Sequence, residues 1–224
     1  EILVPVDDSH REVLDLQTEF PQVRFASQAG VHTYAENRSL GAREASGELV
    51  AFTEDHCLSC PDWCQQIIDT HAKDYAAVWG SVEKLSPDRL LNWAVYFADY
   101  LRYMNPIPAG SVRALTDLNV SYKRAALDTI APIWSQEFHE NQVNVALLGK
   151  GNTLWFQPSM RVDQQRSFNL GQALEDRYAF GRLFATTRVE HAPLSRRLVY
   201  TGFSLLVPFL QVARSTTQIF QKRR

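Results

Sequence analysis

The regular alternation of short apolar runs with segments of helical composition is the feature that most constrains the fold of this chain. Each apolar run is four to eight residues long, the length of a buried strand. Such alternation predicts an α/β domain in which helices cover both faces of a mainly parallel central sheet, a three-layer sandwich. With 224 residues and 45% hydrophobic content, the chain can bury one sizeable core. The predicted strands are 1–6, 23–26, 48–53, 75–82 and 152–158, with a short one inside 111–127.

The predicted helices fill the intervals between these strands. Ser9 or Asp8 is expected to cap the first, and Gly47 is expected to end the second in a left-handed conformation. A third opens at Pro61, a residue favoured in the first turn of a helix. The predicted helical ranges are 9–20, 33–47, 61–72, 88–104, 133–151 and 170–190.

Charge and cysteine content exclude some classes of function. The chain has 23 Lys and Arg against 25 Asp and Glu, a formal net charge of −2. It has no overall basic field, so we do not expect a nucleic-acid partner. All three cysteines lie in 57–64, and no signal peptide is visible. We therefore expect reduced thiols and a cytoplasmic location, although the chain begins inside an apolar run and without Met.

Two groups of acidic residues stand directly after predicted strands. Asp7 and Asp8 follow the first strand, and Glu54, Asp55 and His56 follow the third. In open α/β sheets, ligands bind beyond the carboxyl ends of the strands. Carboxylates there can bind Mg²⁺ or Mn²⁺ together with substrate phosphates, and histidine is also a ligand for Mn²⁺. The alternative is that these acids only end a strand and cap the next helix.

The cysteines beside this group offer a competing interpretation. Cys57, Cys60 and Cys64, preceded by His56, could hold zinc or an iron–sulfur cluster. All of these ligands would come from nine residues, and the adjacency of His56 and Cys57 makes convergence on one ion awkward. We therefore predict small, partly buried thiols beside the site.

The stretch from Asn37 to Trp63, NRSLGAREASGELVAFTEDHCLSCPDW, resembles the central signature of family 2 glycosyltransferases with the GT-A fold. VPVDDS is similar to the family's second strand, and DLNVSYKRAAL to its loop near the donor sugar. WSQEFHENQVNVALLGKGNTLWFQPSMRV is similar to its acidic helix, glycine turn and final strand. The resemblance covers roughly 2–185. The residues at matching spacings in the central signature are Arg38, Gly41, Ala45, Gly47, Glu48, Phe52, Glu54, Asp55 and Trp63.

This resemblance implies a GT-A domain over 1–190, without the family's first strand. It implies inverting transfer of a sugar from a nucleotide-diphosphate donor to a hydroxyl acceptor, with Mn²⁺ or Mg²⁺ as cofactor. The family's DxD motif is here Glu54-Asp55-His56, so either Asp55 or His56 is the expected metal ligand. Two readings from other classes stay open: a degenerate GT-A domain that binds a nucleotide or a partner without turnover, and a metal or redox protein built on the cysteines.

The resemblance also implies roles for individual residues. Glu140 is the expected catalytic base and Glu137 the alternate; three residues apart, they can share one face of a helix. Asp117 and Asn119 are expected either to bind donor sugar or acceptor or to have a purely structural role in their loop. The expected donor contacts elsewhere are Asp7 with Asp8 at the base or ribose, Arg38 at the diphosphate, and Glu54 with Asp55 at the ribose and metal.

The last part of the chain, 191–224, is predicted to be a separate amphipathic segment. Within it, 198–213 is a run of sixteen residues without a charge, bounded by Arg196–Arg197 and Arg214. A helix of that length reaches about 24 Å, short of the ~30 Å hydrocarbon core of a bilayer, and Pro208 is expected to interrupt it. The run predicts an interfacial or re-entrant helix at the inner face of the cytoplasmic membrane, which would suit a lipid-linked acceptor. A terminal helix packed on the domain or on a partner is the alternative.

Overall fold

The computed structural model of the protein describes residues 1–85, 88–113, 118–189, 193–204 and 206–222. Its internal contacts divide the chain into two units, each described by itself below. The first unit contains 1–55, 59–81 and 108–162, and the second contains 56–58, 82–107 and 163–224. The predicted division after residue 190 stays a prediction, because 190–192 are not among the described residues.

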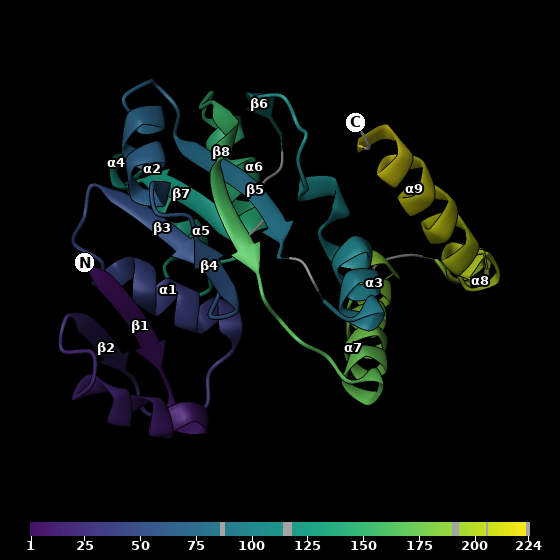
Figure 1. Cartoon of the computed structure of the whole chain (residues 1–224), viewed down its shortest axis with the longest axis horizontal. Coiled ribbons are helices and arrows are strands. Elements are labelled where there is room, and N and C mark those ends of the chain that lie inside the picture. The colour runs from purple at the N-terminus through teal and green to yellow at the C-terminus, as the bar shows by residue number, and fades with distance from the viewer. Residues whose placement is uncertain (86–87, 114–117, 190–192, 205, 223–224) are drawn as a thin grey trace. The chain divides into compact units, whose positions relative to one another are not determined.

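The first unit begins with a small parallel sheet (Figure 1). Strand β1 (Ile2–Val6) pairs in parallel with β2 (Val23–Ser27), and the 3₁₀ helix η1 (Asp8–Gln17) connects them. Helix α1 (Tyr34–Glu44) follows and contacts both strands. The predicted strands 1–6 and 23–26 are thereby confirmed. The cap of η1 is Asp7, whose side chain accepts from the amide of Ser9, and not Ser9 or Asp8 as expected.

A larger sheet forms the centre of the fold, with strand order β3-β7-β5-β8-β4 and β6 paired to β8. Strands β3 and β5 both run antiparallel to β7, and β6 runs antiparallel to β8. Strands β3 and β5 therefore run in the same direction, and β7 between them runs in the opposite direction. Its strands are β3 (Leu49–Thr53), β4 (Cys57–Ser59), β5 (Ala77–Lys84), β6 (Gly110–Val112), β7 (Asn119–Lys123) and β8 (Leu154–Gln164).

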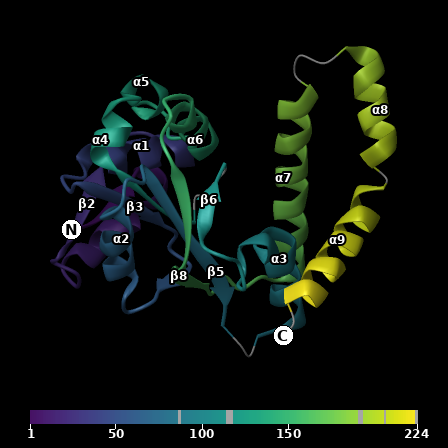
Figure 2. The same cartoon turned by 90° about the horizontal axis from the view of Figure 1, so that it is seen from above.

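Helices cover both faces of this sheet in the first unit, as the three-layer prediction required (Figure 2). Helix α2 (Trp63–His71) lies on one face and buries Ile67 against Val78 and Met160. The opposite face carries an aromatic cluster in which Phe138 contacts Phe52 at 4.8 Å and Tyr122 at 5.6 Å between ring centroids. The helices on that face are α1, α4 (Arg124–Asp128), α5 (Ala131–Trp134) and α6 (Glu140–Gly149).

The second unit is mainly helical. It contains α3 (Leu90–Asp99), the 3₁₀ turn η2 (Leu101–Tyr103), α7 (Leu170–Val189), α8 (Leu194–Ser204) and α9 (Val207–Lys222). Val95 packs against Phe168 and Ala173 in its core. The side chain of Asn92 accepts a hydrogen bond from the amide of Phe168 at 2.9 Å, and Arg177 pairs with Asp99. Burial raises the pKa of the Asp99 carboxyl, an effect that its partner Arg177 opposes.

Two predicted helices differ from the structure in ways that affect the site. Helix α1 ends at Glu44, and Gly47 is not left-handed, because the glycines with positive φ among the described residues are Gly30 and Gly151. The predicted helix 133–151 is broken in two. Helix α5 ends at Trp134 and α6 begins at Glu140, so Glu137 lies in the turn between them and does not share a helix with Glu140.

Candidate active site

The first turns of α1 organise the candidate site. Thr33 and Glu36 form a capping box at the start of this helix: the Thr33 hydroxyl accepts from the Glu36 amide, and the Glu36 carboxylate accepts from the Thr33 amide. This pattern satisfies two amides that would otherwise lack partners at a helix start. The predicted helix start at residue 33 is thereby confirmed.

Asp7, at the end of β1, is the most completely bonded acid of the site. One carboxylate oxygen accepts from the amide and hydroxyl of Ser9, and the other accepts from the His32 amide at 2.9 Å and from the Asn37 side chain at 3.2 Å. These hydrogen bonds, led by the Ser9 hydroxyl, hold the pKa of the Asp7 carboxyl far below its usual range. Asp7 therefore fixes the positions of the η1 start, of the loop at His32 and of α1.

Asp8 strengthens the same corner. One of its carboxylate oxygens accepts from the Gly30 amide at 2.7 Å, while its own amide donates to the Gly30 carbonyl at 2.9 Å. Gly30 has a φ of +93°, a conformation that favours glycine. The ends of β1 and β2 are thus tied together where the predicted donor contacts Asp7 and Asp8 lie.

Glu54 and Asp55 lie at the end of β3, as predicted. The hydroxyl of Tyr34, the first residue of α1, donates to Glu54 Oε1 at 3.1 Å. Asp55 is exposed and Glu54 is half-buried. The guanidinium of Arg38 lies over the rings of Tyr34 and Phe52, 4.6 and 5.1 Å from their centroids, and only 6% of this residue is exposed.

Helix α1 therefore brings the two acidic groups together. Asn37 contacts Asp7 at the end of β1, and Tyr34 contacts Glu54 at the end of β3. Tyr34, Asn37 and Arg38 are spaced three and four residues apart and so lie on one face of the helix. Sequence reasoning identified Arg38 but missed Tyr34 and Asn37, which the helical spacing alone could have added.

The donor set at the β3 end suits a hard divalent cation. Glu54 and Asp55 offer carboxylate oxygens, and Mg²⁺ or Mn²⁺ in nucleotide sites is held by one or two carboxylates with the substrate phosphates. Within the described part of the chain, no group of three or more His, Cys, Asp and Glu could hold an ion by protein ligands alone. His56 is half-buried. Cys57 is buried and Cys60 half-buried, but Cys64 is exposed, so the prediction of partly buried thiols is wrong for Cys64.

Asn119, predicted as a donor or acceptor contact, is fully buried. Its amide nitrogen donates to the carbonyls of Ser81 at 2.9 Å and Met160 at 2.7 Å, and its oxygen accepts from the Trp63 indole at 2.8 Å. The polar atoms of this side chain are hydrogen-bonded within the first unit. Asn119 therefore has the structural role that the sequence analysis named as one of two alternatives. Asp117, the other predicted residue of this loop, lies outside the described residues.

The two candidate bases differ in setting. Glu140 is the first residue of α6 and is half-buried. Glu137 is exposed in the preceding turn, with its carboxylate 3.0 Å from His139 Nε2.

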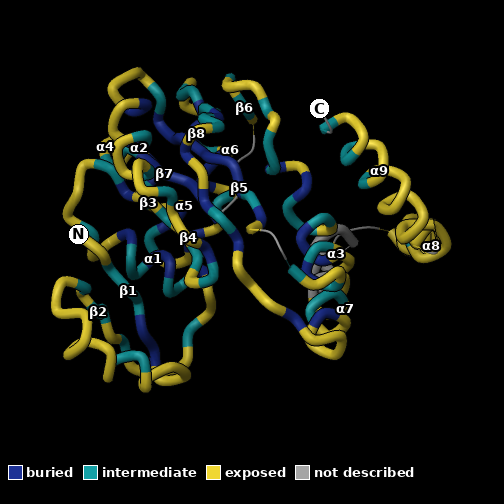
Figure 3. The backbone as a smooth tube through the Cα atoms, in the orientation of Figure 1, coloured by how far each residue is buried: buried dark blue, intermediate teal, exposed yellow. Residues whose placement is uncertain are grey.

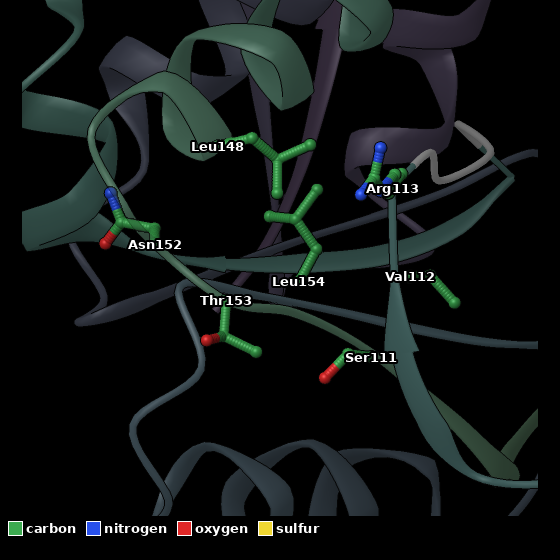
Figure 4. A pocket seen from close by; sticks show the side chains of 7 residues that line it. All are labelled: Ser111, Val112, Arg113, Leu148, Asn152, Thr153 and Leu154. Atoms are coloured by element: carbon green, nitrogen blue, oxygen red, sulfur yellow. The ribbon is translucent and has the colours of Figure 1, made fainter.

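A shallow open pocket lies elsewhere in the first unit (Figure 4). It is formed by β6, the start of β8 and the end of α6, and none of the predicted site residues lines it. Its residues are Ser111, Val112, Arg113, Leu148, Asn152, Thr153 and Leu154.

The fold and the strand-end site can be compared with those of known proteins. The chain is similar to the structure of GalNAc-T7 with UDP, GalNAc and Mn²⁺, with a TM-score of 0.55 and 12% identity over 75% of this chain and 38% of that one. It is also similar to the mannosyltransferase PcManGT from Pyrobaculum calidifontis in complex with GDP-Man and Mn²⁺, with a TM-score of 0.54 and 12% identity over 98% and 75% of the two chains. No curated protein matches the sequence.

These likenesses, at 12% identity, show a shared GT-A fold. The chain spans 38% of the length of GalNAc-T7, so the fold is shared by only a part of that protein. The sequence profile of glycosyl transferase family 2 matches residues 1–131, more than half of the chain. By this match the chain belongs to glycosyl transferase family 2.

Proposed function

We propose that this chain transfers a sugar from a nucleoside-diphosphate donor to a hydroxyl acceptor, with inversion at the anomeric carbon. The observation that carries the proposal is the joining of two acidic strand ends by α1, through Asn37 to Asp7 and Tyr34 to Glu54. Ligands of α/β folds bind at such strand ends. Family membership and the nucleotides UDP and GDP-Man in the two similar structures support a nucleotide-sugar donor.

Glu54 and Asp55 would hold a divalent cation together with the donor diphosphate, with His56 as the alternative ligand. Both similar structures are complexes with Mn²⁺, and carboxylate oxygens also suit Mg²⁺. When bound there, the cation stabilises the negative charge of the departing nucleoside diphosphate. Arg38 contributes a positive charge beside Tyr34 and Phe52. Asp7 orders the loop at His32, and its contact with the base or ribose stays a prediction.

Glu140 is the proposed base and Glu137 the alternate. The carboxylate takes the proton of the acceptor hydroxyl, whose oxygen forms the new bond to the anomeric carbon. The bond from that carbon to the diphosphate oxygen breaks on the opposite face, and the nucleoside diphosphate leaves with the electron pair. Glu140 is preferred because it begins a helix, which holds its backbone in place, whereas Glu137 lies in an exposed turn.

The proposal also includes the acceptor and the location of the reaction. We place the reaction in polysaccharide or glycolipid assembly at the inner face of the cytoplasmic membrane, with a lipid-linked hydroxyl as acceptor. The uncharged run 198–213, flanked by Arg196–Arg197 and Arg214, supports this location.

The proposal is tested with the full chain, Mn²⁺ and a panel of UDP- and GDP-sugars, with release of nucleoside diphosphate as the readout. Glu140→Gln is expected to lower turnover about 10²–10⁴-fold, while Glu137→Gln leaves most of it. Asp55→Asn is expected to raise the Mn²⁺ concentration needed for half-maximal rate. Asp128→Asn, the same change at an exposed site on α4, is the control and should leave both quantities unchanged.

Three results would contradict parts of this proposal. Undiminished turnover in Glu140→Gln removes Glu140 from the mechanism, and loss of turnover in Glu137→Gln alone moves the role to Glu137. Nucleotide binding by calorimetry without hydrolysis or transfer from any donor supports the alternative, a GT-A domain that binds without turnover.

A further inference from the structure

The two C-terminal helices, α8 and α9, are exposed over most of their length (Figure 3). Helices α8 and α9 are bent by 58° at a short break. Large apolar side chains on both are mostly in contact with solvent: Leu198 is 65% exposed, Phe203 61%, Phe209 74%, Val212 66% and Phe220 66%. Contiguous exposed apolar surface of this kind marks an interaction site.

Helix α9 contacts its own unit mainly through polar side chains. Its partly buried residues are Ser215, Gln218, Ile219 and Lys222, which lie on one side of the helix; three of the four are polar. The Lys222 ammonium donates to the Met104 carbonyl, and α9 contacts both η2 and α3. Phe209 and Phe220 lie on the opposite side, where they are exposed. A mostly polar side of α9 thus faces its own unit, and these two phenylalanines are left in contact with solvent.

Helix α8 has the same two-sided composition. Leu198, Val199 and Phe203 lie on one side of the helix and Arg197 lies opposite them, whereas Arg196, two turns before Phe203, lies at the edge of the apolar side. Pro208 lies in the first turn of α9, where its missing amide is tolerated, so the break falls before it and not at it as expected.

The charge of this segment selects the partner. Six of the 23 Lys and Arg residues lie in 191–224, and none of the 25 Asp and Glu residues does. A positive segment complements a negative surface, and each basic residue near an anionic leaflet contributes about 1 kcal/mol of attraction. An apolar face flanked by cations is the composition of helices that lie in the bilayer interface.

The length of the helices decides how they bind. No single helix among the described residues is long and apolar enough to cross a membrane, and α8 with α9 passes that test only as a bent pair. We propose that α8 and α9 lie flat in the interface of an anionic lipid bilayer, with Phe203 and Phe209 inserted and Arg196 and Arg197 at the phosphates. This inference does not depend on the proposed transferase activity.

Flotation of the full chain with vesicles tests the proposal. Vesicles of phosphatidylcholine with 30% phosphatidylglycerol as probe are compared with phosphatidylcholine alone, at low and high salt. We expect binding to the anionic vesicles that weakens with salt. The Arg196→Gln/Arg197→Gln variant should bind roughly 30-fold less tightly, because each charge accounts for about a factor of five. The Phe203→Ser/Phe209→Ser variant should lose about tenfold or more.

Ile68→Ser is the matched control, since Ile68 is 56% exposed on α2 and the chemical change is the same. It should bind as the parent chain does, and circular dichroism should show that all variants are folded. Vesicle binding that the helix variants leave unchanged would overturn the proposal. So would a folded chain that does not float with anionic vesicles. A dimer in sedimentation that Phe203→Ser/Phe209→Ser dissociates, without vesicle binding, would overturn it in favour of a second copy of the chain.

Discussion

The indole nitrogen of Trp63 donates a hydrogen bond to Asn119 Oδ1 at 2.8 Å and so joins two segments that are 56 residues apart. Trp63 begins α2, beyond the acidic end of β3, and Asn119 begins β7, beside β3 in the sheet. The Asn119 amide also bridges the carbonyls of Ser81 and Met160. This side chain therefore connects β5, β7, β8 and α2 in the first unit. Two residues of the family signature are linked through the core, and not through a substrate.

Asn119→Ala is expected to destabilise the protein by about 2–4 kcal/mol. The substitution leaves the Trp63 indole and two strand carbonyls without their partner, and each buried polar group left unpaired costs about 1–3 kcal/mol. Chemical denaturation measures the loss, with Asn141→Ala at an exposed position of α6 as the control. A change of less than about 0.5 kcal/mol would show that Asn119 does not support the core and would return it to the donor or acceptor role.

Gly80→Ala should disrupt the same region more strongly. A Cβ at Gly80 would lie 1.6 Å from the Met160 carbonyl oxygen and 2.4 Å from Asn119 Nδ2. Backbone cannot yield as a flexible side chain does, so we expect a loss above the ~3 kcal/mol of ordinary overpacking, or failure to fold. Gly149→Ala on α6 meets nothing within 4 Å and should be neutral or stabilising by up to about 1 kcal/mol. Equal thermal stability of the two variants would contradict the close approach of β5 at Gly80 to the Met160 carbonyl of β8.

The stability of the protein should fall as the pH drops from about 6.5 to 4. His71 is buried, with Nδ1 3.2 Å from the Tyr75 carbonyl oxygen and Nε2 2.9 Å from the Ser121 hydroxyl. Burial lowers the pKa of His71 to about 4, with Lys123 acting in the same direction. The unfolded chain therefore binds a proton first. The neutral, buried His71 thus contributes on the order of 3 kcal/mol to the free energy of unfolding above pH 6.5, and this contribution is lost as the pH falls toward 4.

Denaturation midpoints between pH 4 and 7 measure this dependence. His71→Gln removes the titrating group, so its stability should vary less with pH over this interval even if the variant is less stable throughout. An unchanged slope in His71→Gln would assign the pH dependence to other groups.

Asp7→Asn is expected to loosen the corner formed by β1, η1 and α1. The native carboxylate accepts from Ser9, His32 and Asn37, whereas an amide nitrogen placed among these donors would repel them. The melting temperature should fall, and limited proteolysis should cut faster near 28–33. Asp15→Asn, at an exposed position in η1, serves as the control. If Asp7→Asn weakens nucleotide binding while melting temperature and proteolysis stay unchanged, Asp7 contacts the donor directly and does not order the loop.

The sequence determined the local elements and the location of the acidic groups. Apolar runs fixed where β1, β2, β3 and β5 lie, because burial of such runs needs only local composition. The signature around Glu54 and Asp55 indicated the family, and the family profile over 1–131 confirmed it. The direction of the strands could not be predicted from the sequence. Strand β7 runs antiparallel to β3 and β5, and no local pattern encodes this, because pairing depends on which strands meet after the chain has folded.

Only the tertiary structure decided how the site residues are used. It placed Tyr34 and Asn37 at the two acidic groups, buried Asn119 and Arg38, and separated Glu137 from the helix that begins at Glu140. It also placed the Lys222 ammonium of α9 against the Met104 carbonyl of the same unit. These outcomes depend on contacts between segments far apart in the chain. A sequence shows which side chains carry charge or apolar surface, but their burial and their partners are set by the packing of distant elements.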